Sequence, residues 1–235
     1  MLTVDFGEIS LKAGMLVLDA GCGAGRHLCE AIGKSGVNCV GVDLNWEDLC
    51  KTKGFLSLMD REQVGGWIVA RADVTRLPFS DGCFDVVICS EVLEHVVENK
   101  TAVAELLRVL KPLGDLIVTV PRFLPERICW ALSKAYHCEP GGHIRIYTKG
   151  ALLNLLQEAG ADCRRIRYRH GLHAPYWWLR CLVGHKNESF PLVRAYRKFL
   201  EWGIIRHSSL TAIMDRMLNP LIGKSIVLYL KKGYR

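Results

Sequence analysis

Residues 17–27 read VLDAGCGAGRH, and this stretch decides which fold the sequence predicts. The apolar run at 15–19 that leads into it is short, as is typical of a buried strand in a parallel sheet. The glycine cluster lets the backbone turn tightly. Leu28, Ala31 and Ile32 then recur at the spacing of one helical face. A strand, a glycine-rich turn and a helix in this order indicate the first unit of an α/β sheet protein.

The same alternation of strands and helices continues along the chain. Seven strands are expected, at residues 15–19, 37–43, 67–70, 84–90, 115–120, 161–169 and 225–231. Asn45 and Thr148 are the expected N-caps of two of the intervening helices. Strands that alternate with helices favour a parallel sheet that is covered on both faces. We therefore expect residues 1–235 to form one α/β domain with a doubly wound, mainly parallel seven-stranded sheet.

The composition narrows the class of protein. The chain has 235 residues, half of them hydrophobic, which is enough for one large α/β domain. It contains no run of 18 apolar residues, so no membrane-spanning helix is expected. Residues 1–10 contain Asp5 and Glu8 and lack the basic start and apolar run of a signal peptide, which favours a cytoplasmic location.

The cysteine pattern and the net charge bear on whether the chain binds a metal ion or nucleic acid. Ten cysteines occur without a CxxC pair, several of them inside apolar runs, and we interpret them as free thiols. Because zinc ligands group at short spacing, no metal site is predicted. The formal net charge is +7, and much of the basic excess lies after residue 160, as at 163–170. No nucleic-acid-binding module is evident, so no stable nucleic-acid partner is expected.

Polar residues and glycines stand where the predicted strands end, which is where parallel α/β sheets bind their ligands. The three glycines of GCGAG bring the backbone close to a ligand, and the helix after them favours a carboxylate at its amino end. Asp19 is placed to accept from an ammonium group, Asp43 to bind two ribose hydroxyls and Asp73 to accept from an adenine amino group. Each group suits one part of a nucleoside ligand.

Five segments, VLDAGCGAGRH, GVDL, ADVTRLPF, FDVVICSEVLEHV and LKPLGDLIVTVP, resemble in order and spacing the successive motifs of class I S-adenosylmethionine (SAM)-dependent methyltransferases. The resemblance covers about residues 15–160 and the last strand. It implies a Rossmann-like methyltransferase fold, SAM as cofactor, and Ser90 and Glu91 beside the transferring methyl group. The cofactor-binding residues expected from the chemistry and the resemblance together are Asp19, Gly21, Gly23, Gly25, Arg26, Asp43, Leu44, Asp73, Val74 and Ser90.

A nicotinamide-dependent dehydrogenase is the main alternative for this glycine-rich turn. The dehydrogenase fingerprint is GxGxxG, whereas here the third glycine comes one position earlier. Asp19 in the preceding strand would face a pyrophosphate, which is unfavourable, whereas it would attract the ammonium group of a methionine moiety. The turn and its acidic partners therefore favour SAM.

Because the methyl group of SAM is already activated, the enzyme mainly has to align a nucleophile with the sulfur–methyl bond. A hydroxyl nucleophile also needs a general base. The predicted catalytic residues are Glu91, His143 and Tyr147. The last two belong to GGHIRIYT, and the family often has a similar G-H-x-R segment near its substrate side. For His95, local packing or capping is the preferred interpretation.

Two segments exceed what the family motifs require. Residues 121–142 follow the fifth strand, and residues 170–223 separate the last two strands, which usually form a tight hairpin in this family. Both leave from the ligand edge, so we expect two helical insertions that cap the substrate; a thicker core is the alternative. Two apolar helical faces are expected in the second segment, made by Leu192, Val193, Tyr196, Phe199 and Leu200 and by Leu210, Ile213, Met214, Met217 and Leu218.

The function predicted from the sequence is methyl transfer from SAM to a small or medium-sized acceptor at oxygen, such as a metabolite, a glycan or a lipid head group. The alternatives are an RNA or protein methyltransferase and a catalytically idle SAM-binding protein. The aromatic and basic segment WWLRCL at 177–182 also permits peripheral contact with a membrane surface.

Overall fold

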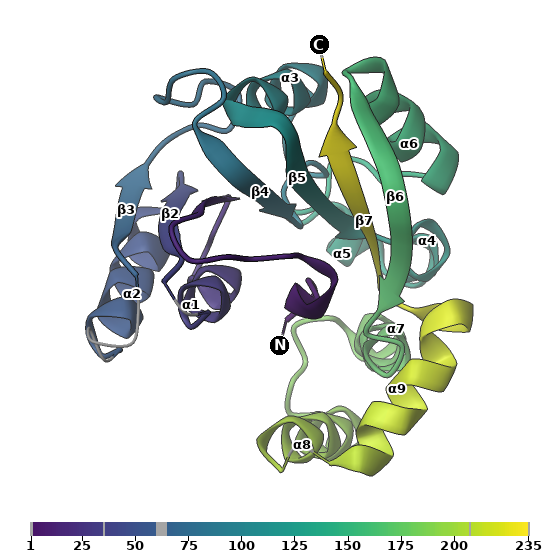
Figure 1. Ribbon diagram of the computed structural model, residues 1–235. Coiled ribbons are helices and arrows are strands. Elements are labelled where there is room, and N and C mark those ends of the chain that lie inside the picture. Colours follow the sequence, from purple (N-terminus) through teal and green to yellow (C-terminus); the bar gives the residue numbers. More distant parts are fainter. Residues whose placement is uncertain (1, 35, 60–64, 207, 235) are drawn as a thin grey trace.

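The computed structural model describes residues 2–34, 36–59, 65–206 and 208–234, and these form a seven-stranded sheet in the order β3-β2-β1-β4-β5-β7-β6 (Figure 1). The strands are β1 (Leu16–Ala20), β2 (Asn38–Asp43), β3 (Trp67–Arg71), β4 (Phe84–Ser90), β5 (Leu110–Pro121), β6 (Ala161–Arg169) and β7 (Ser225–Lys232). Strands β1 to β5 pair in parallel, whereas β7 is antiparallel to both of its neighbours. The predicted mainly parallel α/β sheet is confirmed.

Helices cover both faces of this sheet, as the alternation of elements predicts (Figure 1). The described helices are α1 (Arg26–Ile32), α2 (Trp46–Ser57), α3 (Asn99–Val109), α4 (Phe123–Leu132), α5 (Lys134–His137), α6 (Lys149–Glu158), α7 (His173–Val183), α8 (Pro191–Ile205) and α9 (Ser209–Ile222), with a 3-10 turn η1 (Phe6–Glu8). The Asn45 and Thr148 side chains accept hydrogen bonds from backbone amides in the first turns of α2 and α6, which confirms both predicted caps.

The core consists of two apolar layers, one on each face of the sheet. Leu18 lies in the layer that α3 and α6 complete, together with Leu106 and Leu152. Val17, its neighbour on β1, lies in the opposite layer with Leu28 of α1. Successive strand residues point to opposite faces, so this alternation fixes the register of β1. All ten cysteines are free thiols, as expected.

Strand β6 lies at the edge of the sheet, because β7 separates it from β5. Both β5 and β6 are antiparallel to β7, so they run in the same direction. The carboxyl end of β6 therefore faces the same edge as the carboxyl ends of the parallel strands. Residues 170–223 begin at that end and form α7, α8 and α9, which Figure 1 shows as a group of helices beyond the end of β6. We call this group the α7–α9 lobe.

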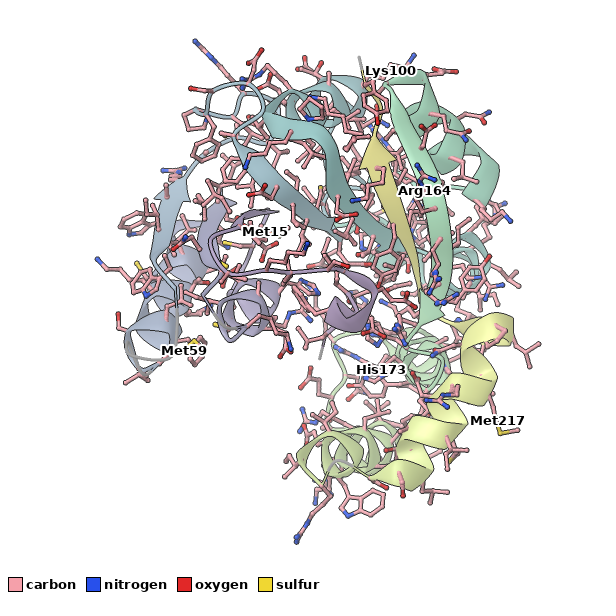
Figure 2. The ribbon with its side chains drawn as sticks, viewed as in Figure 1. Met15, Met59, Lys100, Arg164, His173 and Met217 are labelled. Carbon is pink, nitrogen blue, oxygen red and sulfur yellow. The ribbon has the colours of Figure 1, made fainter. Side chains whose placement is uncertain are left out.

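Helix α9 presents most of its apolar stripe to the solvent. Leu210, Ile213 and Met217 are 56%, 57% and 70% exposed, and Figure 2 shows Met217 on the outer side of the helix. Its inner side is held by polar groups instead: the Asn219 side chain accepts from the Gly171 amide (2.8 Å), and Asp215 accepts from the Leu172 amide (3.0 Å). Buried amides need such partners, which is why the polar side of α9 faces inward. Among the described helices, none has the length and apolar character that a membrane crossing requires.

Candidate functional site

A cavity of about 620 Å³ opens where the first four strands end. Its walls are the glycine-rich turn after β1 and the segments that follow β2, β3 and β4. All the described residues that line it lie between positions 21 and 98. The predicted site residues among them are Gly21, Gly23, Arg26, Asp43, Leu44, Asp73, Val74, Ser90 and Glu91. Residues from four separate elements thus meet at one edge of the sheet, as the topology of parallel strands requires.

Glycine is needed at two positions of the turn for steric reasons. Gly21 has φ 79°, and a Cβ there would lie 2.2 Å from a methyl group of Val92. Gly25 has φ 78°, and a Cβ there would lie 2.6 Å from the Thr52 methyl group. Any larger residue would be strained and would push apart the turn and the elements that pack on it. Gly25 supports the cavity from behind and does not line it.

Asp43, at the end of β2, holds the turn in place. One oxygen of its carboxylate accepts from the Gly23 amide, and the other accepts from the Asn45 amide, both at 2.8 Å. Each carboxylate oxygen can accept more than one hydrogen bond. Asp43 can therefore keep these two contacts and still accept from the hydroxyl groups of a ligand in the cavity.

Asp73 occupies the corresponding position after β3. Its Oδ1 accepts from the backbone amide and from the hydroxyl group of Thr75, both at 2.8 Å. This turn fixes the direction of the carboxylate on the cavity wall, opposite the glycine-rich turn.

Asp19 lies behind the glycine-rich turn and does not line the cavity. It is 1% exposed, and neither of its oxygens has a hydrogen-bond partner among the described residues. Burial raises the pKa of the Asp19 carboxyl to about 7, although the nearby backbone amide of Leu28, and then the positive charge of Arg26, oppose this shift. An unpaired buried carboxylate is unfavourable, so the electrostatics of this position suit a cationic group in or near the turn.

Ser90 and Glu91, at the end of β4, are joined through a residue of β5. The Ser90 hydroxyl donates to the Thr119 hydroxyl at 2.8 Å, and Thr119 donates to the Glu91 carboxylate at 2.9 Å. Glu91 has φ 57°, a conformation that non-glycine residues seldom adopt. Such local strain is common where a side chain has to be held in a functional position.

His143 and Tyr147 lie beside the cavity wall and do not line it. His143 Nδ1 donates to Glu126 Oε1 of α4 at 2.7 Å, and its ring centroid is 5.0 Å from that of His95, which lines the cavity. The Tyr147 hydroxyl donates to the Leu93 carbonyl (3.2 Å) and accepts from the Asn99 side chain (2.6 Å). These contacts hold the Tyr147 side chain against residues 93–99, the segment that carries His95.

Burial and neighbouring charges shift the pKa values of three titratable side chains beside the cavity, His95, Glu94 and Glu126. Burial, then the nearby His143, lowers the pKa of His95 and favours its neutral form. Burial, then the charge of Glu91, raises the pKa of Glu94 well above its ordinary value. Burial opposes ionisation of Glu126 too, but the hydrogen bond from His143 holds its pKa below the ordinary value.

Three residues of this site escaped the sequence analysis. Thr119 occupies one position of the apolar run of β5, Glu94 lies in a short turn, and Glu126 belongs to α4. Glu94 and Thr119 lie within two of the quoted motif segments, but nothing in those segments singles them out, because each gains its importance from contacts with residues far along the chain. The unusual observation at Glu126 and Glu94 is a carboxylate with no exposed surface, which only the folded chain shows.

Comparison with known proteins decides the family. The model of the methyltransferase domain family matches residues 3–166, well over half of the chain. The chain belongs to this family. The match includes the glycine-rich turn and every residue that lines the cavity, so it confirms the resemblance that the motifs carried.

Two curated relatives illustrate the range within the methyltransferase family. A ubiquinone biosynthesis O-methyltransferase of Methylococcus capsulatus is 38% identical over 107 residues, which are 44% of this chain and 42% of that protein. Norajmaline N-methyltransferase of Rauvolfia serpentina is 29% identical over 102 residues, 43% of this chain and 34% of that protein. The chain thus spans about a third to two fifths of the length of these relatives.

A solved structure shares the fold over the whole chain. A SAM-dependent methyltransferase of Methanosarcina mazei superposes with a TM-score of 0.66 at 15% identity and covers 100% of both chains. The helices that follow residue 166 lie outside the family match.

Replacing Asp19 with asparagine should change how stability depends on pH. An unfolded aspartate ionises near pH 4, whereas the folded Asp19 carboxyl has a pKa of about 7, so the folded state holds an extra proton between these values. Its stability falls as the pH rises through that window, by up to about 4 kcal/mol. An asparagine side chain binds no proton, so D19N should lose this dependence. Urea unfolding of both proteins without ligand at pH 4 and pH 8 measures it, and parallel pH profiles would refute the assignment.

Proposed function

We propose that this chain transfers the methyl group of SAM to a small or medium-sized acceptor, at an oxygen atom. The observation that carries the proposal is the cavity at the strand ends, where a glycine-rich turn meets the carboxylates of Asp43 and Asp73. Membership of the methyltransferase family supports the same reaction.

The cavity offers a separate group for each part of the cofactor. The turn at 21–25 and Arg26 would hold the methionine moiety, with the negative charge of Asp19 behind its ammonium group. Asp43 would accept from the ribose hydroxyls. Leu44 and Val74 would flank the adenine ring while Asp73 accepts from its amino group. The acids on the wall suit a cationic nucleoside and disfavour a pyrophosphate.

The methyl group would then lie near the end of β4, where Ser90 and Glu91 line the cavity. Glu91 is the candidate base, because its side chain is oriented by Thr119 and stands on the wall itself. His143 does not line the cavity and contacts its wall through the ring of His95. Tyr147 contacts both Leu93 and Asn99 in the segment that carries His95, which favours a positioning role over direct catalysis.

The acceptor would approach from the side of the two insertions. Helix α4 of the first insertion packs against α7 of the lobe, and the Trp178 indole donates to the Pro125 carbonyl at 3.0 Å. His185 also contacts Glu139 at 3.0 Å. Residues 121–142 and 170–223 thus form one layer, and the contact between His143 and Glu126 links this layer to the wall of the cavity. This supports the capping role over a simple thickening of the core.

Asp43→Ala should weaken cofactor binding because it removes the ribose acceptor and loosens the turn. The loss should be about 1–3 kcal/mol, which is roughly a 5- to 150-fold rise in Kd. Titration calorimetry with SAM and S-adenosylhomocysteine measures it. Asp81→Ala is the matched control, since Asp81 is exposed and pairs with Arg108 outside the cavity. Equal affinities in the two variants would contradict the proposed pose.

Labelled SAM should distinguish the acceptor classes. We expect the chain to transfer a labelled methyl group into the small-molecule and lipid fractions of a cell extract. Label in RNA or protein would favour those acceptors instead. SAM binding with no label in any fraction would favour an idle SAM-binding protein and would refute the proposed transfer.

Trp178→Ala should test the capping layer, because it removes the contact between α7 and α4. We expect kcat/KM for the acceptor to fall about tenfold or more, with an unchanged SAM Kd, since loosened positioning costs rate without touching the cofactor cavity. Trp202→Ala is the control, because Trp202 is a half-exposed tryptophan on α8 of the same lobe. An equal kcat/KM in both variants would show that the layer only adds to the core.

A further inference from the structure

We propose that Glu94, His95 and His143 bind a divalent transition-metal ion that holds the acceptor oxygen beside the methyl group of SAM. The existence of the metal site rests on the geometry of these three side chains, whereas its role in catalysis rests on the proposed function. The sequence alone predicted no metal site, because metal ligands usually group at short spacing and these three residues do not.

The three side chains converge although they come from different parts of the chain. One ligand atom from each lies within 4.8 Å of the other two. His95 Nε2 is 4.0 Å from Glu94 Oε1, and the two imidazole rings lie edge to face with centroids 5.0 Å apart. These separations fit around one ion after small side-chain movements, because metal–ligand bonds of about 2.0–2.2 Å place two ligand atoms roughly 3 Å apart.

Both histidines are already oriented as metal ligands. His95 Nδ1 donates to the Gly142 carbonyl at 3.1 Å, and His143 Nδ1 donates to the Glu126 carboxylate at 2.7 Å. Each hydrogen bond fixes the proton on Nδ1 and leaves the lone pair of Nε2 for an ion. A carbonyl or carboxylate on the second nitrogen is the usual support of a metal-binding histidine.

The buried carboxylate of Glu94 points independently to a cationic ligand. Its side chain has no exposed surface, and neither oxygen has a hydrogen-bond partner among the described residues. The positive charge of Lys224 acts on Glu94, but its ammonium group lies over the Trp177 ring, 4.6 Å from the centroid, and forms no described ion pair with Glu94. An isolated buried carboxylate is costly, whereas a carboxylate bound to a cation is stable.

The ligand set indicates the class of ion. Two imidazoles and one carboxylate suit manganese, iron, cobalt or zinc better than calcium or magnesium, which prefer oxygen ligands alone. Three protein ligands leave coordination positions open for water or for a substrate. The remaining carboxylates nearby, Glu91 and Glu126, add negative charge that favours a divalent cation.

The place of the cluster suits an acceptor with a hydroxyl group. His95 is both a proposed ligand and part of the cavity wall, close to Glu91. An ion there would lower the pKa of a bound acceptor hydroxyl, whose proton passes to Glu91 or to water. The acceptor oxygen then forms its bond to the methyl carbon as the sulfur–methyl bond breaks, and S-adenosylhomocysteine leaves as the neutral thioether.

Metal binding can be measured without any acceptor. After treatment with a chelator and its removal, the full chain should bind about one Mn²⁺ or Zn²⁺ per molecule in titrations with the chloride salts, followed by electron paramagnetic resonance or calorimetry. Glu94→Gln and His95→Ala should each weaken binding at least about tenfold, and Glu126→Gln about 10- to 100-fold through His143. His95 is partly exposed, so H95A is the variant that least disturbs the fold.

His185→Ala is the matched control, since His185 also pairs with a carboxylate in the same layer but lies outside the cluster. It should bind metal as the unaltered chain does. Glu94, Glu126 and His185 do not line the cavity, so the variants at these three positions should keep their affinity for SAM. This separates a failure of the metal site from a failure of the proposed cofactor site. Absence of binding in the unaltered chain, or equal binding in all variants, would overturn the metal site. Methyl transfer that persists in excess chelator would overturn its role with the acceptor.

Discussion

The hydrogen bond between the Gly23 amide and the Asp43 carboxylate holds together the wall of the cavity at the strand ends. It joins the turn after β1 to the end of β2, and the second oxygen of Asp43 holds the start of the next helix through Asn45. The turn can adopt this shape only because Gly21 and Gly25 have positive φ and no side chain. One carboxylate therefore shapes the loop, and in the proposed function the same carboxylate would accept from the ribose hydroxyls.

Two carboxylates, Asp19 and Glu94, are buried without hydrogen-bond partners in the described part of the chain. Asp19 lies near the end of β1, just before the glycine-rich turn, and Glu94 lies beside His95. Folding would not retain an unpaired buried acid for stability, because its ionised form is poorly solvated. Such groups are common where positive charge has to be bound. In this chain they suit two cationic ligands: a SAM molecule at Asp19 and a metal ion at Glu94.

The part of the chain that matches the family and the part that follows it would have different roles in the proposed reaction. The family match ends at residue 166, and every described residue on the cavity wall lies before that point. Beyond it, the α7–α9 lobe packs on α4, and Glu126 of α4 contacts His143, which lies beside the cavity wall. In the proposed reaction, the first part would hold the cofactor. The second part is where a preference for one acceptor would arise, because loops and insertions at the ligand edge vary without disturbing the sheet.

The sequence by itself determined the sheet, the caps at Asn45 and Thr148, and about half of the residues that line the cavity, because these depend on local periodicity and on the rule that parallel strands end at one edge. Only the tertiary structure decided what meets beside that wall. His95 and His143 are 48 positions apart, and Glu126 comes from a helix that no motif marks. Likewise, the apolar stripe of α9 predicted a buried face, but the buried amides at 171 and 172 needed the polar side of the helix, and the stripe turned outward. Contacts between distant segments carry no periodic signal, so folding alone determines them.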